Sequence, residues 1–177
     1  SNIEGFMYVS MNSIYQAAIT FTSQNVGAHQ YRRIRKICFT TVMVVSAIGL
    51  ALGGVAMLFR HQLISIYNQD PAVMKRAVVR LEIFAATYFT CGVMDVLCGM
   101  LRGLGSTIIP MFVSLLRACA FRIFWIYCIL PFDRTPFMLY FSYPVSWVLT
   151  SAIHFLCYLH LLKRFPVEPE KLSAVKA

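Results

Sequence analysis

The chain has 177 residues, of which 59% are hydrophobic and only 13% are charged. Soluble domains carry roughly 45–50% apolar and about 25% charged residues, so both departures indicate a chain that lies in lipid. Disorder is excluded because disordered segments have low hydrophobicity. The net charge of +9 does not indicate nucleic acid, because the basic residues cluster at the ends of apolar runs, as in the cytoplasmic loops of membrane proteins.

Charge-poor stretches divide the chain into five expected transmembrane helices. Each reaches about 20 residues, the length that an α-helix needs to cross the hydrocarbon core of a bilayer. The alternating polarity of β-barrel strands is absent from the sequence, and helices satisfy their own backbone hydrogen bonds in lipid. The expected spans are residues 5–28, 37–59, 80–102, 107–131 and 137–163. The sequence therefore predicts an all-α, polytopic transmembrane bundle over residues 1–165.

Lysine and arginine are distributed unevenly over the connectors, and this predicts the orientation of the helices. The first, third and C-terminal connectors hold nine of these residues, and the other two hold five. Positive charge accumulates in cytoplasmic loops, so the first helix should begin outside the cell and residues 166–177 should form a cytoplasmic tail. An outside start without a signal segment indicates the later part of a longer polytopic protein. The second connector holds Asp70-Pro71, a pair typical of a helix start, and we expect a short interfacial helix there.

Polar side chains at four-residue spacing form a stripe along the first expected helix. The stripe consists of Asn12, Gln16, Thr20 and Gln24, which share one helix face. Lipid solvates amides poorly, so these side chains should face other helices or a wet cavity. Two interpretations stay open, namely hydrogen bonds between helices and a pathway for a solute.

Asp95 is the one acidic residue deep within an expected span. A carboxylate there needs a partner or a function, because its insertion into the membrane costs a few kcal/mol. Tyr88 shares its helix face, so the two residues offer oxygen atoms to a cation or a proton. Arg117 lies on the next expected helix, about one turn (~5.4 Å) deeper, within reach of the Asp95 carboxylate. The alternatives are therefore a pathway carboxylate and a structural ion pair.

The sequence lacks recognisable motifs for catalysis or metal binding. It contains no H-E-x-x-H, no P-loop and no nucleophile elbow. Its six cysteines lie in apolar stretches without zinc-like or redox spacing. We therefore expect no enzymatic activity, no metal site and no cofactor.

Three blocks of sequence resemble MATE transporters, the multidrug and toxic compound extrusion family. Residues 24–28 with the basic residues after them resemble the Q-N-x-G-A turn that follows the family's eighth helix. Residues 101–111 resemble its L-R-G-x-G…P segment between helices ten and eleven, and residues 143–147 resemble a stretch near the start of helix twelve. The motif residues in the first two blocks are Gln24, Asn25, Gly27, Arg102, Gly103, Gly105 and Pro110.

The resemblance implies a twelve-helix protein in two lobes of six, in which this chain supplies helices eight to twelve. It implies the C-terminal portion of a multidrug efflux antiporter coupled to H+ or Na+, in which a cavity between the lobes opens to each side in turn. The implied partners are the lipid bilayer, organic and often cationic drugs, and the missing N-terminal lobe, without which the chain should be inactive. The implied location is a bacterial plasma membrane, and no nucleic acid is expected.

Two other functions stay open at this stage. A lipid-linked oligosaccharide flippase of the same superfamily should have an extended basic groove. Nine Met and fourteen Phe favour a drug cavity instead, because methionine surfaces adapt to varied ligands. A nontransporting membrane scaffold would use the polar stripe and the buried charges for helix packing alone.

Overall fold

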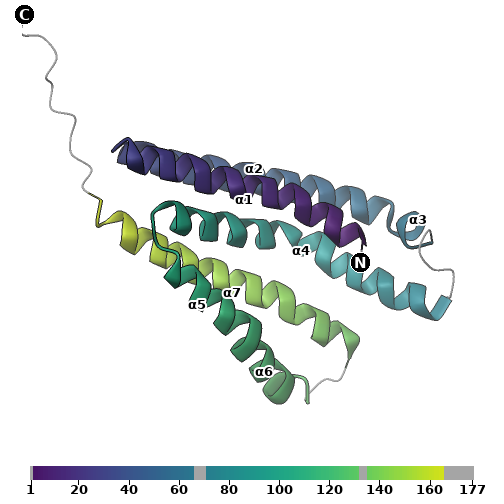
Figure 1. The fold of residues 1–177 in the computed structure, drawn as a ribbon. Coiled ribbons are helices and arrows are strands. Elements are labelled where there is room, and N and C mark those ends of the chain that lie inside the picture. The colour runs from purple at the N-terminus through teal and green to yellow at the C-terminus, as the bar shows by residue number, and fades with distance from the viewer. Residues whose placement is uncertain (1, 66–70, 132–134, 166–177) are drawn as a thin grey trace, which may run out of the picture.

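The computed structural model describes residues 2–65, 71–131 and 135–165. All regular structure in these residues is helical, which confirms the all-α fold class. The long helices run antiparallel in turn, so that the α1–α2 turn, the α4–α5 turn and the end of α7 meet at one end of the bundle (Figure 1). The elements are α1 (Asn2–Gly27), α2 (Tyr31–Leu58), α3 (Arg60–Ser65), α4 (Pro71–Gly103), α5 (Ile108–Leu116), η1 (Arg117–Phe121), α6 (Arg122–Phe124), η2 (Trp125–Ile129) and α7 (Pro136–Leu162).

Four stretches of the described residues are long and apolar enough to cross a membrane. They are Tyr31–Leu58, Ala77–Gly103, Ile108–Ile129 and Phe137–Leu162. Helix α1 has 26 residues and matches them in length, but its polar stripe makes it less apolar than these four. It packs in the bundle nonetheless, against α2 and α4.

The helices differ from the expected spans at their N-terminal ends. Helix α2 begins at Tyr31 rather than at residue 37, because the basic residues of the first connector are themselves helical. Helix α4 begins at Pro71, so this proline starts the long helix and not a separate interfacial one. The short helix of this connector is α3, which lies before that point. Asp70 and the predicted tail over 166–177 lie outside the described residues.

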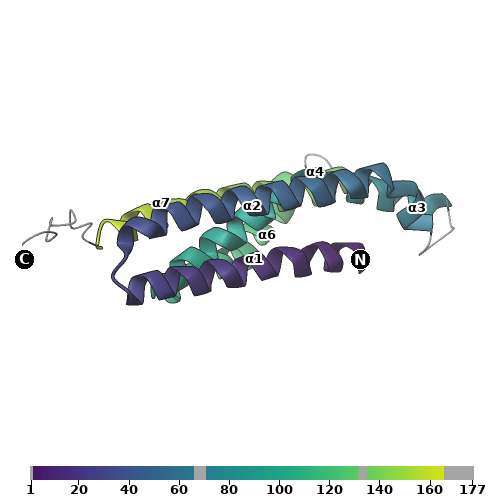
Figure 2. The same ribbon diagram turned by 90° about the horizontal axis from the view of Figure 1, so that it is seen from above.

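Helix α4 is the centre of the bundle and packs against α1, α2, α3 and α7. Figure 2 shows α2, α4 and α7 in one layer, with α1 and the segment containing α6 on one side of it. Close approach depends on glycine. A Cβ atom at Gly49 would lie 2.8 Å from the Phe89 Cα, and one at Gly53 would collide with the Ala85 carbonyl oxygen. Gly49 and Gly53 form a G-x-x-x-G pair, which lets two helix backbones approach in a membrane.

The same device joins α4 to α1. A Cβ atom at Gly103 would lie 2.6 Å from the Thr22 Cβ, and one at Gly99 would lie 3.0 Å from the Tyr15 carbonyl oxygen. Helix α4 is followed by Gly105 in the left-handed region (φ 86°), and the Ser106 N–H donates to the Leu101 carbonyl at 3.0 Å. Glycine adopts this conformation without steric cost, which explains the turn in the L-R-G-x-G segment.

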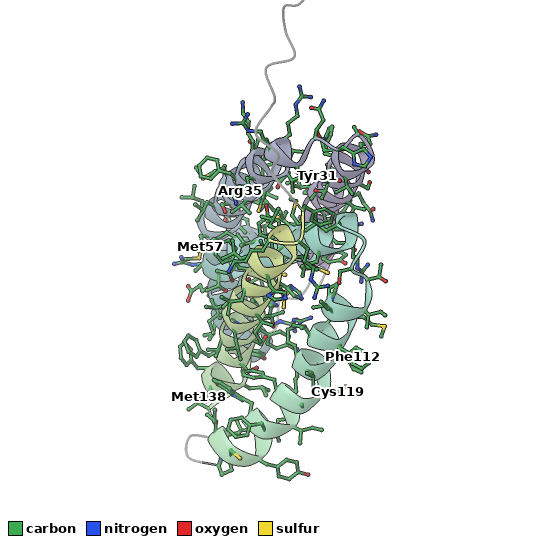
Figure 3. The ribbon with its side chains drawn as sticks, turned by 90° about the vertical axis from the view of Figure 1, so that its left-hand side faces the viewer. Tyr31, Arg35, Met57, Phe112, Cys119 and Met138 are labelled. Carbon is green, nitrogen blue, oxygen red and sulfur yellow. The ribbon has the colours of Figure 1, made fainter. Side chains whose placement is uncertain are left out.

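The segment Ile108–Ile129 diverges from the rest of the bundle. It contains two π-helical turns, η1 and η2, and in Figure 3 the part that bears Phe112 and Cys119 stands apart from the ribbon that bears Tyr31 and Arg35. Two hydrogen bonds attach it to α7. The Trp125 Nε1 donates to the Met138 carbonyl at 3.1 Å, and the Arg122 Nη1 donates to the Tyr143 hydroxyl at 2.8 Å.

Candidate functional site

Asp95 lies on α4 within electrostatic range of Tyr15 on α1 and of Arg117 on η1. The carboxylate is half-buried, and Cys91 and Cys98 lie one turn away on the same helix face. The guanidinium of Arg117, on η1, is close enough to interact electrostatically with all three groups. The structure thus brings together Asp95 and Arg117, the two charges that the sequence singled out.

Asp95 and Arg117 interact at a distance and not by direct contact. Within the described part of the chain, no N···O pair between them is as short as 4.0 Å, and no hydrogen bond engages the carboxylate. The Arg117 Nε is buried without a hydrogen-bond partner among those same residues. Both roles considered for Asp95 stay predictions.

Helix α1 contributes Tyr15 to this face. The Arg102 Nη1 donates to the Tyr15 hydroxyl at 2.6 Å, and the Arg102 guanidinium carbon lies 5.9 Å from the centre of the same ring. Asp95 is also within electrostatic range of Tyr15. Arg102 belongs to the L-R-G segment, so one function of that motif is to tie the end of α4 to α1.

The polar stripe of α1 points away from α2 and α4. Asn12 is half-buried, and Gln16, Thr20 and Gln24 are exposed. Met11, Ala18 and Thr22, which form the packed face of the helix, are buried. The Thr20 hydroxyl donates to the Gln16 carbonyl of its own helix at 2.9 Å. Across the described ranges, none of the four side chains bonds to another helix, so the stripe does not hold this bundle together.

Tyr88 lies in the core between α4 and α7. It is buried, and its ring meets the Trp147 ring edge-on at 6.1 Å, beside Phe84 and Tyr143. The helix-face argument placed Tyr88 beside Asp95, and the structure packs the Tyr88 ring against Trp147 of the aromatic group between α4 and α7. The role predicted for Tyr88 in an ion pathway stays a prediction.

A second polar stripe, on α7, has the same four-residue spacing and was not recognised in the sequence. Unlike the stripe of α1, it is buried along its whole length. It consists of Ser142, Ser146, Thr150, His154 and Tyr158. The same count of polar residues at i and i+4 that identified the stripe of α1 would have found it.

The middle of the α7 stripe adjoins Arg117. A cavity of about 200 Å³ between η1 and α7 is lined by Arg117, Ser146 and Thr150 together with apolar residues. His154 is 1% exposed, and it is in electrostatic range of Arg117. Its ring faces the Met94 backbone, yet neither ring nitrogen has a well-formed hydrogen bond within the described part of the chain.

The motif residues that the sequence singled out lie in the two turns at one end of the bundle. The Gln24 carbonyl accepts from the Ala28 N–H at 2.9 Å, and the Asn25 amide donates to the Phe21 carbonyl at 2.8 Å. Gly27 is the last residue of α1, and Pro110 is buried in the first turn of α5, where a missing N–H costs no helical hydrogen bond. These residues shape turns and helix ends.

Comparison with known proteins identifies related chains. The family model MatE matches residues 1–128. A curated relative, the probable multidrug resistance protein NorM of Chromobacterium violaceum, is 29% identical over 119 residues, which are 64% of this chain and 24% of that protein. The chain therefore spans about a quarter of the length of this relative.

Solved structures show the same fold. The Vibrio cholerae MATE transporter VcmN in its bent form matches with a TM-score of 0.82 and 18% identity, over 93% of this chain and 37% of that chain. An inward-facing multidrug resistance MATE family transporter matches with a TM-score of 0.82 and 14% identity, over 98% and 39% of the two chains. An outward-facing structure of such a transporter also gives 0.82, with 13% identity, over 92% and 37%.

Proposed function

Because this chain belongs to the MATE family of multi-pass membrane transporters, we propose that it is the C-terminal portion of a cation-coupled multidrug efflux antiporter. Its helices correspond in this proposal to helices eight to twelve of a twelve-helix protein. The observation that carries the proposal is Asp95, a half-buried carboxylate within a candidate span that has no direct ion pair among the described residues.

Asp95 is proposed to bind the coupling ion, which is H+ or Na+. A charged carboxylate in a membrane span costs a few kcal/mol, and a bound cation removes that cost. Arg117, which acts on the carboxylate from η1, repels a bound cation and so favours its release. The carboxylate is neutralised when the ion is bound and charged when the site is empty. This difference lets ion binding shift the conformational equilibrium of the two lobes.

The exposed stripe of α1 is proposed to line the cavity between this lobe and the N-terminal lobe. Asn12, Gln16 and Thr20 offer amide and hydroxyl oxygens to an organic cation, and a wet cavity satisfies them as lipid does not. The name of the NorM relative, a probable multidrug resistance protein, supports drugs as the substrates. Because the stripe is only one wall of such a cavity, the chain without the N-terminal lobe is expected not to transport.

Two further observations support this assignment. The fold matches inward-facing and outward-facing transporters equally well, with a TM-score of 0.82 to each, as expected if this part moves as a rigid unit during alternating access. The basic residues of the α1–α2 turn and of the α7 C-terminus gather at one end of the bundle. This supports a cytoplasmic position for that end, in the plasma membrane of a bacterium such as the one that carries the NorM relative.

The test is the isosteric substitution Asp95→Asn in the full-length transporter. We expect the thermal stability in detergent to be kept and the efflux of a fluorescent organic cation from cells to fall to the level of cells without the transporter. The amide keeps the shape but cannot alternate between charged and neutral states. The matched control is Glu82→Gln, which removes the other carboxylate of the described α4, ion-paired to Arg60 at 3.4 Å, and should retain efflux.

The same variants distinguish the alternative role of Asp95 as a structural partner. A loss of stability in Asp95→Asn that Arg117→Gln restores in the double variant would assign the carboxylate to a buried ion pair, whose breakage costs about 3–5 kcal/mol in soluble cores. Full efflux together with full stability in Asp95→Asn would contradict both roles.

A further inference from the structure

A groove lies between α2, α4 and α7, on the side of α4 opposite to Asp95. Its volume is about 630 Å³, and its walls include Phe39 and Val42 of α2, Val93 and Leu97 of α4, and Phe155 of α7. Val93 and Leu97 are two residues before and after Asp95. Two residues correspond to about 200° around a helix, so both point away from the polar face.

The lining makes this groove suited to hydrocarbon. Most of its residues are aliphatic or aromatic, and the Tyr158 hydroxyl in its wall is directed to the Ile34 carbonyl, 3.5 Å away. Phe39 and Phe155 on its rims are exposed, with 68% and 45% of their surface accessible. Apolar rims of this kind within candidate spans are suited to contact with lipid.

One end of the groove is basic. Arg35, in the first two turns of α2, lines the groove, is exposed, and has no hydrogen bond or ion pair to any residue that the structure describes. Lys163 and Arg164 follow Leu162, which lines the same end from α7. The segments that meet there, residues 20–45, 97–116 and 152–165, contain no acidic residue. Figure 3 views the bundle from this end, with Arg35 labelled.

We propose that the groove binds an anionic phospholipid from the bilayer, with one acyl chain between α2 and α7 and the headgroup phosphate on Arg35. The lengths agree with this arrangement. From Arg35 to Val42 the groove follows seven residues of α2, or roughly 10 Å at 1.5 Å per residue, which takes it from the basic end toward the middle of the bundle. Basic pockets between transmembrane helices on the cytoplasmic side are typical sites for anionic headgroups.

The acyl chain and the phosphate contribute differently to recognition. An acyl chain in a groove exchanges lipid contacts for protein contacts, which yields little free energy, because lipid tails are as apolar as the groove. Selection among lipids therefore depends on Arg35. One basic residue near an anionic membrane surface contributes about 1 kcal/mol, which corresponds to roughly fivefold in affinity. Phosphatidylglycerol should be preferred over zwitterionic phosphatidylcholine by about this factor.

The experiment is native mass spectrometry of the chain released from nanodiscs that contain phosphatidylglycerol and phosphatidylcholine in equal amounts. The wild-type chain should retain phosphatidylglycerol in preference. Arg35→Gln should remove roughly fivefold of that preference. The matched control is Arg33→Gln, which loses the same charge from an exposed side chain on the same turn but about 200° around the helix, and should keep the preference.

A second pair of variants tests the acyl chain. Ala152→Phe places a large side chain in the groove wall and should lower the retention of both lipids, whereas Ala118→Phe, at an exposed alanine of η1 outside the groove, should change neither. Ala152→Leu introduces a smaller side chain at the same position and replaces the phenylalanine variant in this test if that variant does not fold.

Four outcomes would overturn the proposal. Equal effects of Arg35→Gln and Arg33→Gln would mean that the basic residues attract anionic lipid through their overall charge and not through a site at Arg35. Unchanged retention in the filled variants would mean that no chain enters the groove. Displacement of phosphatidylglycerol by soluble glycerol phosphate would mean a site for phosphate alone. Loss of the retained lipid in the full-length transporter would mean that another part of the protein covers the groove. None of these measurements depends on drug efflux.

Discussion

The polar stripes of α1 and α7 have the same four-residue spacing but differ in burial. The stripe of α1 is built from amides and one threonine and is largely exposed, whereas the stripe of α7 is built from hydroxyls and one imidazole and is buried. Ser142 and Ser146 each donate to a carbonyl of their own helix, at 2.7 Å in both cases. A serine can therefore be buried without a partner on another helix.

An amide has no such solution. Asn and Gln carry two donors and an acceptor with two lone pairs, more than their own helix backbone can satisfy. Burial of such a group without partners costs about 1–3 kcal/mol in protein mutational data, which agrees with the exposure of Gln16 and Gln24 and the partial exposure of Asn12 on α1. The comparison teaches that the spacing of polar residues predicts a stripe and that their chemistry predicts which way it faces.

The first prediction concerns an amide, the side-chain type of the α1 stripe, placed in the buried stripe of α7. Ser142→Gln puts an amide without partners, and additional volume, into the packed face of α7. We expect thermal unfolding in detergent to report a loss of about 3 kcal/mol, from the unsatisfied amide and the overpacking together. The matched control is Ser23→Gln on α1, whose hydroxyl also bonds its own helix, at 2.9 Å to the Ile19 carbonyl, but is exposed. It should stay within about 0.5 kcal/mol of wild type, and equal losses in both variants would contradict the comparison.

The second prediction concerns His154, the member of the buried stripe whose ring nitrogens have no well-formed hydrogen bond among the described residues. His154→Leu should stabilise the chain by about 1 kcal/mol, because replacement of an unsatisfied polar group by an apolar one of similar volume removes a desolvation penalty. The measurement is again the unfolding transition, with His160→Leu at an exposed position of the last turn of α7 as control. Destabilisation by His154→Leu would show instead that the imidazole has a partner that matters in the membrane.

The third prediction has the smallest effect on stability. Gln16→Leu in the exposed stripe should change the free energy of unfolding by no more than about 0.5 kcal/mol, because the side chain has no hydrogen bond to another helix in the described part of the chain. In the full-length transporter the same variant should reduce efflux of organic cations, since it removes polar groups from the proposed cavity wall. A large loss of stability with normal efflux would show that the stripe packs against another helix of the protein.

Much of this architecture was predictable from local patterns. The all-α bundle, the alternation of long apolar helices and the gathering of basic residues at the connectors follow from composition and run length. The stripe of α1 was found because i and i+4 residues share a face of any helix. Asp95 and Arg117 were selected for their rarity in apolar spans, and the structure brings them into electrostatic range.

Other features depended on how the helices pack. Tyr88 and Asp95 share a face in an ideal helix, yet Tyr88 is buried against Trp147 of α7, whereas Asp95 is only half-buried. Helix packing also decides that α4 is buried, whereas the segment Ile108–Ile129 is exposed. Both are apolar, but 56% of residues are buried in the most apolar stretch of the first and 6% in that of the second.

The sequence by itself determined that this chain is a bundle of long, apolar helices of the kind that cross a membrane, that α1 carries a polar stripe and which family the chain resembles. Only the tertiary structure decided that α4 is the central helix, that the α7 stripe is buried and that a groove separates α2 from α7. The reason is physical. Hydropathy and periodicity act within one helix, but the rotation of a helix against its neighbours depends on where backbones can approach, and here that is at glycines such as Gly53 and Gly103, on separate helices.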